Sequence, residues 1–202
     1  MGPAKPAAAV EVALSDEELI QALIAGNLRA GELLYDRLIR VVEWTVSRVM
    51  GRERGDCADI VQNAFEQIVT TLYRDSFARG CSLTSWACAV TSRVAFTELR
   101  TNQRRTRNLG RRVEVPEAQL AHGAPDAEAL ASARQDLERV RAALSTLNPE
   151  RAEVLVLHEL NGLELSEIAR TLRLSVSAVQ SRLSRGRRDL VERLQAEERG
   201  IS

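Results

Sequence analysis

The residues best suited to chemistry in this sequence lie near its C-terminus, within residues 163–188. A short apolar pattern that ends at Leu172 is followed by a turn and then by a second helical pattern. The second pattern presents hydroxyl, amide and guanidinium side chains to solvent: Ser175, Ser177, Gln180, Ser181, Arg182 and Arg185. Short polar side chains and arginine are what base edges and phosphates require. The spacing therefore predicts a helix-turn-helix that contacts DNA.

Apolar residues at matching positions predict how these two helices pack against each other. The expected buried side chains are Ile168, Ala169 and Leu172 on the first helix, and Val179 and Leu183 on the second. The small Ala169 suits two helices that cross at a steep angle. Arg173 occupies the turn, where glycine is common, at a modest conformational cost. The alternative is an ordinary helical hairpin within a bundle.

Catalytic chemistry has no comparable constellation in the sequence. His122 and His158 lack nearby partners for acid–base or metal chemistry. Cys57, Cys81 and Cys88 form no close metal-binding pair, so we expect free thiols that pack as small apolar residues. A redox or metal role for these cysteines is the alternative. The sequence thus predicts neither an enzyme nor a cofactor.

The distribution of charge points to two contacts with a polyanion. The formal net charge is zero, from 28 basic and 28 acidic residues. The basic residues cluster in two segments, with Arg93, Arg100, Arg104, Arg105, Arg107, Arg111 and Arg112 in the first, and Arg170, Arg173, Arg182, Arg185, Arg187, Arg188 and Arg193 in the second. Between them lie Glu114, Glu117, Asp126, Glu128, Asp136 and Glu138. This distribution indicates two basic patches joined by an acidic tether. Either patch alone is also typical of a solvated helix face.

Helical periodicity dominates the chain, which has 202 residues and only 3% aromatic residues. We predict an all-α fold, with two helical domains joined by a flexible linker and the helix-turn-helix in the second domain. The expected boundaries are a disordered extension at 1–13, a first domain at 14–108, a linker at 109–135 and a second domain at 136–202.

Local signals place the individual helices. Ser15 and Glu18 form a predicted capping box, Asp56 is a candidate cap for a third helix, and Asn148 precedes Pro149 at the start of another. We expect two short helices and a basic tail after Gly162. No apolar run is long enough to cross a membrane, and the N-terminus lacks a signal-peptide pattern. These features predict a cytoplasmic protein.

Five stretches resemble the extracytoplasmic-function (ECF) sigma factors, which are promoter-specificity subunits of bacterial RNA polymerase. They read SDEELIQALIAGN, LLYDRLIRVV, GDCADIVQNAFEQIVTTLYRD, SLTSWACAVTSRVAFTELR and LSTLNPERAEVLVLHELNGLELSEIARTLRLSVSAVQSRLSRGRRDL. The resemblance covers roughly residues 15–108 and 136–195, with the motifs in the family's order and spacing.

The resemblance implies three sets of site residues. Positions that dock on the clamp helices of the largest polymerase subunit are matched by Asp59, Ile60, Gln62, Asn63 and Phe65. Positions that bind the minus-ten element, where a flipped base is captured, are matched by Ser82, Thr84, Ser85, Arg93, Arg100, Arg104 and Arg105. Positions that enter the major groove at the minus-thirty-five element are matched by Ser175, Ser177, Ala178, Gln180, Ser181, Arg182 and Arg185. For Ile60 and Phe65, simple core packing is the rival interpretation.

Some positions depart from the family pattern. Gln180 stands where lysine is frequent, Arg93 where asparagine is frequent and Ala89 where arginine is frequent. These departures concern which promoter sequence is preferred. In the family, the acidic linker threads through the polymerase, but a solvated tether fits the residues equally well.

The resemblance implies three partners: core RNA polymerase, promoter DNA and an anti-sigma factor. Membrane insertion is not expected, and neither is a metal. Two other classes remain as rivals. A free-standing helix-turn-helix regulator would bind DNA without polymerase, and an enzyme such as a metal hydrolase would need a ligand cluster that the sequence lacks.

Overall fold

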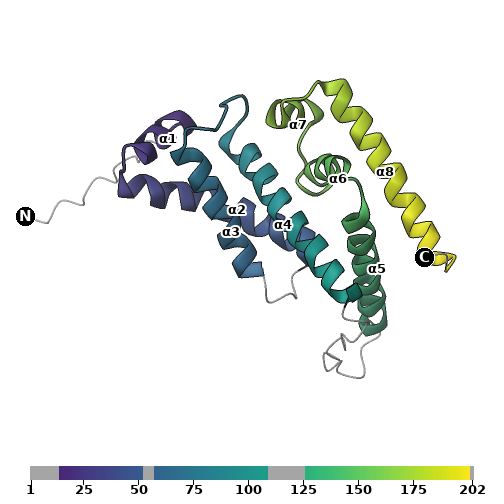
Figure 1. The fold of residues 1–202 in the computed structure, drawn as a ribbon. Coiled ribbons are helices and arrows are strands. Elements are labelled where there is room, and N and C mark those ends of the chain that lie inside the picture. Colours follow the sequence, from purple (N-terminus) through teal and green to yellow (C-terminus); the bar gives the residue numbers. More distant parts are fainter. Residues whose placement is uncertain (1–13, 52–56, 109–125, 201–202) are drawn as a thin grey trace, which may run out of the picture.

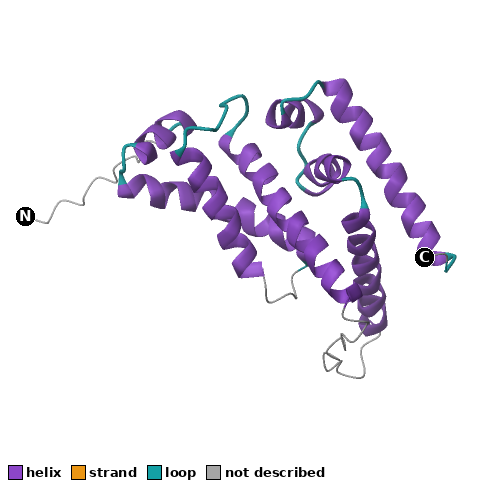
Figure 2. Ribbon diagram, viewed as in Figure 1, coloured by secondary structure: helices purple, strands orange, loops and turns teal. Residues whose placement is uncertain are grey.

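The computed structural model describes residues 14–51, 57–108 and 126–200, and these ranges hold helices and connecting turns with no strand (Figure 2). The all-α prediction is confirmed. In chain order the elements are α1 (Asp16–Ile24), α2 (Leu28–Met50), α3 (Cys57–Tyr73), α4 (Leu83–Asn108), α5 (Asp126–Thr146), α6 (Pro149–Leu155), the π-helical turn η1 (Val156–Leu160), α7 (Leu165–Leu172) and α8 (Val176–Glu198).

Helix starts follow the capping signals of the sequence. The Ser15 hydroxyl accepts a hydrogen bond from the Glu18 N–H, and the Glu18 carboxylate accepts one from the Ser15 N–H, which completes the capping box. The Asn148 side chain accepts from the N–H of Glu150 ahead of α6. The expected cap at Asp56, the N-terminal extension and residues 109–125 of the linker lie outside the described residues.

The helices form two groups that pack against each other (Figure 1). Helices α1–α4 make the N-terminal half, with α2 packed along α4, and α5–α8 make the C-terminal half. One apolar cluster belongs to the N-terminal half alone and includes Leu34, Ile68 and Leu83. A second cluster crosses between the halves and joins Phe96 on α4 to Ile168 on α7. The two halves therefore share a continuous core in this arrangement.

Two elements differ from the sequence-based expectation. The sequence predicts a helix from Pro149 to about Leu160, but after Leu155 the chain forms the π-helical turn η1. The last segment is one helix, α8, rather than a short helix with a basic tail. Leu183 and Leu190 repeat at helical spacing and both pack on the core, so apolar burial sustains α8 beyond the turn motif. Helix α5 begins at Asp126, close to the start at about Ala127 that helical periodicity predicts, and it spans the predicted domain boundary at residue 136.

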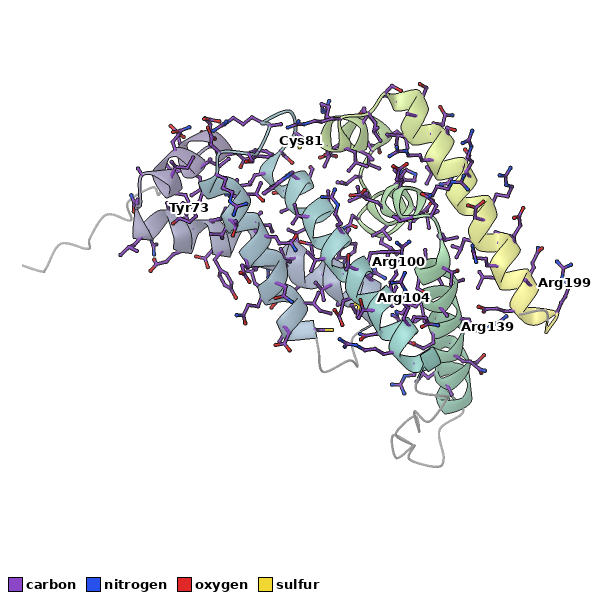
Figure 3. All side chains as sticks on the ribbon, in the orientation of Figure 1. Tyr73, Cys81, Arg100, Arg104, Arg139 and Arg199 are labelled. Carbon is purple, nitrogen blue, oxygen red and sulfur yellow. The ribbon has the colours of Figure 1, made fainter. Side chains whose placement is uncertain are left out.

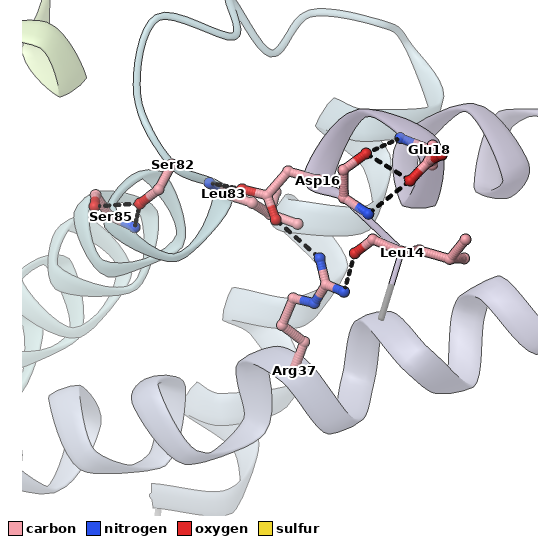
Figure 4. A network of polar contacts seen from close by, with 8 residues as sticks. Leu14, Asp16, Glu18, Arg37, Ser82, Leu83 and Ser85 are labelled. Carbon is pink, nitrogen blue, oxygen red and sulfur yellow. Dashed lines mark hydrogen bonds and ion pairs between the residues drawn. The ribbon is translucent and has the colours of Figure 1, made fainter. Parts of the chain in front are cut away.

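A single carboxylate joins three segments of the N-terminal half (Figure 4). Asp16 accepts a hydrogen bond of 2.8 Å from the Leu83 N–H at the start of α4. Its other oxygen lies 2.9 Å from the Arg37 guanidinium on α2, and Arg37 also donates to the Leu14 carbonyl. Asp16 thus fixes where α4 begins relative to α1 and α2.

Replacing Asp16 with alanine is expected to lower the free energy of unfolding by about 1–3 kcal/mol, because a half-buried N–H and guanidinium lose their acceptor. Urea denaturation monitored by circular dichroism measures this change. Asp36→Ala is the matched control, since Asp36 is exposed on α2, and it should change stability by less than about 0.5 kcal/mol. Equal losses in the two variants would contradict the role assigned to Asp16.

Candidate nucleic-acid interface

Helices α7 and α8 form the predicted helix-turn-helix. Ile168, Ala169, Val179 and Leu183 are buried between them and their neighbours, as the apolar spacing predicted. The turn passes through Arg173, which takes the left-handed conformation at φ 55° and ψ 46°. The Ser175 hydroxyl then caps α8 by accepting from the Ala178 N–H at 3.1 Å. The sequence therefore builds this motif through local packing and one side-chain cap.

The outer face of α8 carries the side chains expected at the minus-thirty-five element. Ser175, Ser177, Gln180 and Arg185 are exposed, whereas Ala178, Ser181 and Arg182 are half-buried. Arg182 is held by Glu150 on α6, with 2.9 Å between nitrogen and oxygen, and its side chain is only 29% exposed. Among the described residues no carboxylate pairs with Arg185. Arg185 is thus the more available cation for a base or a phosphate.

Further ion pairs and one close backbone contact set the position of α8 on the C-terminal half. Arg151 pairs with Asp189 at 2.5 Å, and Arg187 pairs with Glu159 at the same distance. Gly186 is buried where α8 crosses α6. These contacts hold the exposed face of α8 at a fixed orientation.

The N-terminus of α4 carries the serines expected at the minus-ten element. Ser82 and Thr84 are exposed, and the Ser82 hydroxyl accepts from the Ser85 N–H at 3.1 Å, which caps the helix. Ser85 itself is buried at 3% exposure, and its hydroxyl donates to the Glu167 carboxylate on α7. Ser82 and Thr84 are therefore accessible in this arrangement, whereas Ser85 is covered by the C-terminal half.

The arginines along α4 also divide into those that contact the C-terminal half and those that are accessible. Arg93 donates to Glu153 on α6 at 2.7 Å. Arg100 donates to two carbonyl oxygens at the end of α5, those of Ser145 at 3.1 Å and Leu147 at 2.5 Å. Burial, together with the positive charge of Arg104, lowers the pKa of Arg100.

The remaining cations of α4 are more open. Arg104 is exposed at the junction of α4 and α5 (Figure 3). Arg105 is also exposed, and its guanidinium lies 4.0 Å from the Glu98 carboxylate. Of the four arginines expected to hold phosphates, Arg104 and Arg105 are therefore the two that form no hydrogen bond or ion pair with the described residues of the C-terminal half.

The expected polymerase-binding residues lie along α3. Asp59, Gln62 and Asn63 are exposed. Phe65 is half-buried, and its ring centroid lies 5.0 Å from that of Tyr35 on α2. Ile60 is only 3% exposed, so core packing is its role in this arrangement.

An apolar groove of about 760 Å³ runs between α2 and α3 beside these residues. Its walls include Leu34, Tyr35, Ile39, Val61, Phe65 and Val69. An apolar groove bordered by exposed polar side chains has the make-up of a protein interface. Phe65 therefore joins the groove, whereas Ile60 does not.

Several polar residues at the junction of the halves were not identified from the sequence. The Asn161 amide donates to the Thr45 hydroxyl at 2.6 Å, although 116 residues separate them. Glu153 and Glu167 contact the α4 residues described above. Glu167 stands in the first turn of α7, where a carboxylate is expected simply to offset the helix dipole. Only the tertiary arrangement distinguishes these residues from ordinary surface groups.

The cysteines and His158 offer no evident site for chemistry. The thiols of Cys81 and Cys88 are free. Burial raises the pKa of the Cys88 thiol to about 11, so the reactive thiolate is scarce at neutral pH. His158 forms a hydrogen bond of 2.9 Å with the Leu163 carbonyl. Within the described residues, histidine, cysteine and acidic side chains form no group of three or more able to hold a metal ion.

No helix among the described residues has the length and apolar character needed to span a membrane.

This chain is similar to known proteins both in one region and over most of its length. The family model "Sigma-70, region 4" matches residues 137–190. The RNA polymerase sigma factor NccH of Alcaligenes xylosoxydans xylosoxydans is 28% identical over 185 residues, which cover 90% of this chain and 95% of NccH.

Two solved structures are also similar. CnrH, solved in complex with the cytosolic domain of CnrY, has 26% identity and a TM-score of 0.52 and covers 88% of this chain and 96% of its own. The sigma factor RpoE of Bartonella quintana, solved with the anti-sigma factor NepR, has 20% identity and a TM-score of 0.47 and covers 79% of this chain and 95% of its own.

Proposed function

Because this chain belongs to the extracytoplasmic-function group of sigma factors, as its sequence predicted, we propose that it directs core RNA polymerase to specific promoters. In this proposal α8 binds the minus-thirty-five element, and the start of α4 with the loop before it binds the minus-ten element. The groove-bearing face of α3 binds the polymerase. The protein acts in the cytoplasm as an initiation factor rather than an enzyme.

The observation that carries the proposal is the exposed polar face of α8 within a region 4 helix-turn-helix. Ser175, Ser177, Gln180 and Arg185 project from one helix that ion pairs hold against the rest of the domain. A rigid helix of this kind fits the major groove, where amides and guanidiniums distinguish base pairs. The separate cationic helix α4 supports a second DNA contact.

Positioning explains how such a protein would promote initiation. Two DNA contacts on one chain, bound together to polymerase, raise the local concentration of each promoter element at its site. Capture of an unpaired strand then favours duplex opening. From the family we also propose an anti-sigma factor as a partner.

The test is in vitro transcription with core RNA polymerase and a library of promoters from the source genome. The proposal expects initiation from a defined subset of promoters only when this protein is added, and the recovered sequences report both promoter elements. Tight footprinting of a promoter by the protein alone would instead favour a free-standing regulator. Stoichiometric zinc in the purified protein would revive the enzyme alternative.

Arg185 and Arg182 are expected to differ in how they support promoter binding. Arg185→Ala should weaken holoenzyme binding by about 1–3 kcal/mol if the exposed guanidinium reads a base. Arg182→Ala should act through loss of its pair with Glu150, so Glu150→Ala should reproduce most of its effect. Filter binding on promoters altered at single minus-thirty-five positions measures both. A uniform and salt-sensitive loss for Arg185→Ala would mark a phosphate contact instead.

A further inference from the structure

The loop between α3 and α4, residues 74–82, holds two residues in the left-handed backbone conformation. Asp75 has φ 48° and Arg79 has φ 56°, a region that residues other than glycine seldom adopt. Asp75 ends α3, since its N–H donates to the Leu72 carbonyl and the N–H of the next residue donates to Thr71. This pattern is common at helix C-termini, so helix termination explains the conformation of Asp75.

Arg79 lies within the loop rather than at the end of a helix, so its conformation needs another cause. The next residue is Gly80, which could adopt a left-handed conformation without strain, yet Arg79 adopts it instead. The Arg79 side chain forms two ion pairs, with Nε 2.6 Å from Glu17 on α1 and a terminal nitrogen 2.5 Å from Asp75. Backbone strain persists only where the surrounding structure imposes it. The two ion pairs are the contacts that impose it here.

Two further contacts fix the ends of the exposed part of the loop. Phe77 is only 5% exposed, and its ring centroid lies 5.0 Å from that of Trp86 on α4. At the other end the Leu83 N–H donates to the Asp16 carboxylate (Figure 4). Most of residues 78–82, between these two anchors, are exposed. The exposed segment is therefore fixed at both ends and supported from α1 between them.

We propose that Arg79 is a positioning residue for minus-ten recognition, because its pairs with Glu17 and Asp75 keep the loop in the form that accepts promoter DNA. The inference rests on the proposed function, which assigns this loop to the minus-ten element. An ordered loop binds more tightly than a loose one, since it loses less conformational entropy on binding. Both ion pairs lie within the protein, so Arg79 acts through the loop rather than as a DNA-binding cation.

The proposal also gives the first turn of α1 a role. Asp16 and Glu17 are successive carboxylates at the start of that helix, where acidic residues are expected simply to offset the helix dipole. Asp16 fixes the start of α4, and Glu17 holds the loop before it. Helix α1 thus supports the minus-ten loop, although none of the residues expected to contact DNA lies on it.

The first measurement is the affinity of the holoenzyme for a fluorescein-labelled single strand that carries the minus-ten element of a promoter recovered by the transcription assay. Arg79→Ala and Glu17→Gln should each weaken binding by about fivefold, because the binding-competent fraction of the loop falls. The two effects should not add, since both variants break the same contact. Arg79→Lys keeps the charge and should restore part of the affinity.

Glu17→Gln distinguishes support of the loop from a direct DNA contact. If Arg79 bound a phosphate, its release from Glu17 would strengthen binding. Arg79→Ala would then weaken binding to all sequences alike and reduce the salt dependence. Either result would overturn the proposal, which expects reduced discrimination at individual minus-ten positions and an unchanged salt dependence. Glu32→Gln is the matched control, because it neutralises an exposed carboxylate that pairs with Arg29 on α2, and it should leave the affinity unchanged.

Order in the loop is measured on the full chain without polymerase. Trp44→Phe leaves Trp86 as the only tryptophan, and acrylamide quenching of its fluorescence reports how well Phe77 covers it. In this background Arg79→Ala should increase quenching, whereas Glu32→Gln should not. Unchanged quenching in Arg79→Ala would contradict the support assigned to the arginine. Failure of the unaltered protein to direct transcription would instead contradict the proposed function, so the two failures are distinguishable.

Discussion

Replacing Asp59 and Phe65 together with alanine is expected to weaken binding to core RNA polymerase by about 1,000-fold, because two hot-spot residues that each contribute roughly 2 kcal/mol together contribute about 4 kcal/mol of binding free energy. Asp59 is exposed on α3, and the Phe65 ring lines the apolar groove against Tyr35. The double variant removes the charge of Asp59 beside the groove and the aromatic ring of Phe65 within it. Transcription should fall with the loss of binding.

Ile60→Ala is the control that distinguishes loss of the polymerase interface from loss of folding stability. Ile60 is buried on the same helix, so its truncation should lower the free energy of unfolding by about 2–4 kcal/mol. The folded fraction of that variant should still bind core polymerase normally. Biolayer interferometry with immobilised core polymerase, alongside thermal melts, measures both quantities. Normal affinity in the Asp59 and Phe65 double variant would remove α3 from the interface.

Local features of the fold could be predicted because their causes lie within a few residues of one another. The capping box at Ser15 and Glu18 and the cap at Asn148 each need only a short polar side chain and a nearby N–H. Ile168 and Val179 were predicted to be buried because an amphipathic pattern determines which face of each helix packs inward. The helix-turn-helix was therefore evident before its surroundings were known.

Long-range polar pairing could not be predicted in the same way. Arg93 and Glu153 are 60 residues apart in sequence, and each alone is typical of a solvated helix face. Asn161 stands in a turn, where asparagine is expected for local reasons, yet its amide bonds to Thr45. The resemblance to the family thus identifies the candidate DNA residues on α4, and the packing of the second half determines which of them are covered.

Helix α8, here called the recognition helix, also has an ion pair with a distant segment that could not be predicted from the sequence. The sequence placed Arg182 and Arg185 together as DNA contacts, since both follow the turn at compatible spacing. Glu150 distinguishes them by pairing with Arg182 alone, and that pair depends on how α6 crosses α8. The geometry of this crossing consequently determines which cations remain available to DNA.

Gly186→Val is expected to destabilise the C-terminal half by about 2–3 kcal/mol, because the α6–α8 crossing has no space for a branched side chain. A Cβ atom at position 186 would lie 3.2 Å from the Arg151 carbonyl oxygen and 3.3 Å from a methyl group of Leu155. The two helices must separate to accept valine, which also strains the pairs that Arg151 and Arg182 make across the same crossing.

Minus-thirty-five binding should fall together with stability in Gly186→Val, since α8 loses its fixed orientation. Ser184→Val is the matched control: Ser184 is exposed on the same helix, so the variant introduces the same β-branched residue without a clash. Gly186→Ala should lie between the two, because its better helix propensity of about 1 kcal/mol offsets part of the crowding. Chemical denaturation and promoter binding by the holoenzyme measure the series. Equal stability of the two valine variants would show that α6 and α8 do not approach closely in solution, and the positioning of the recognition helix would then need another cause.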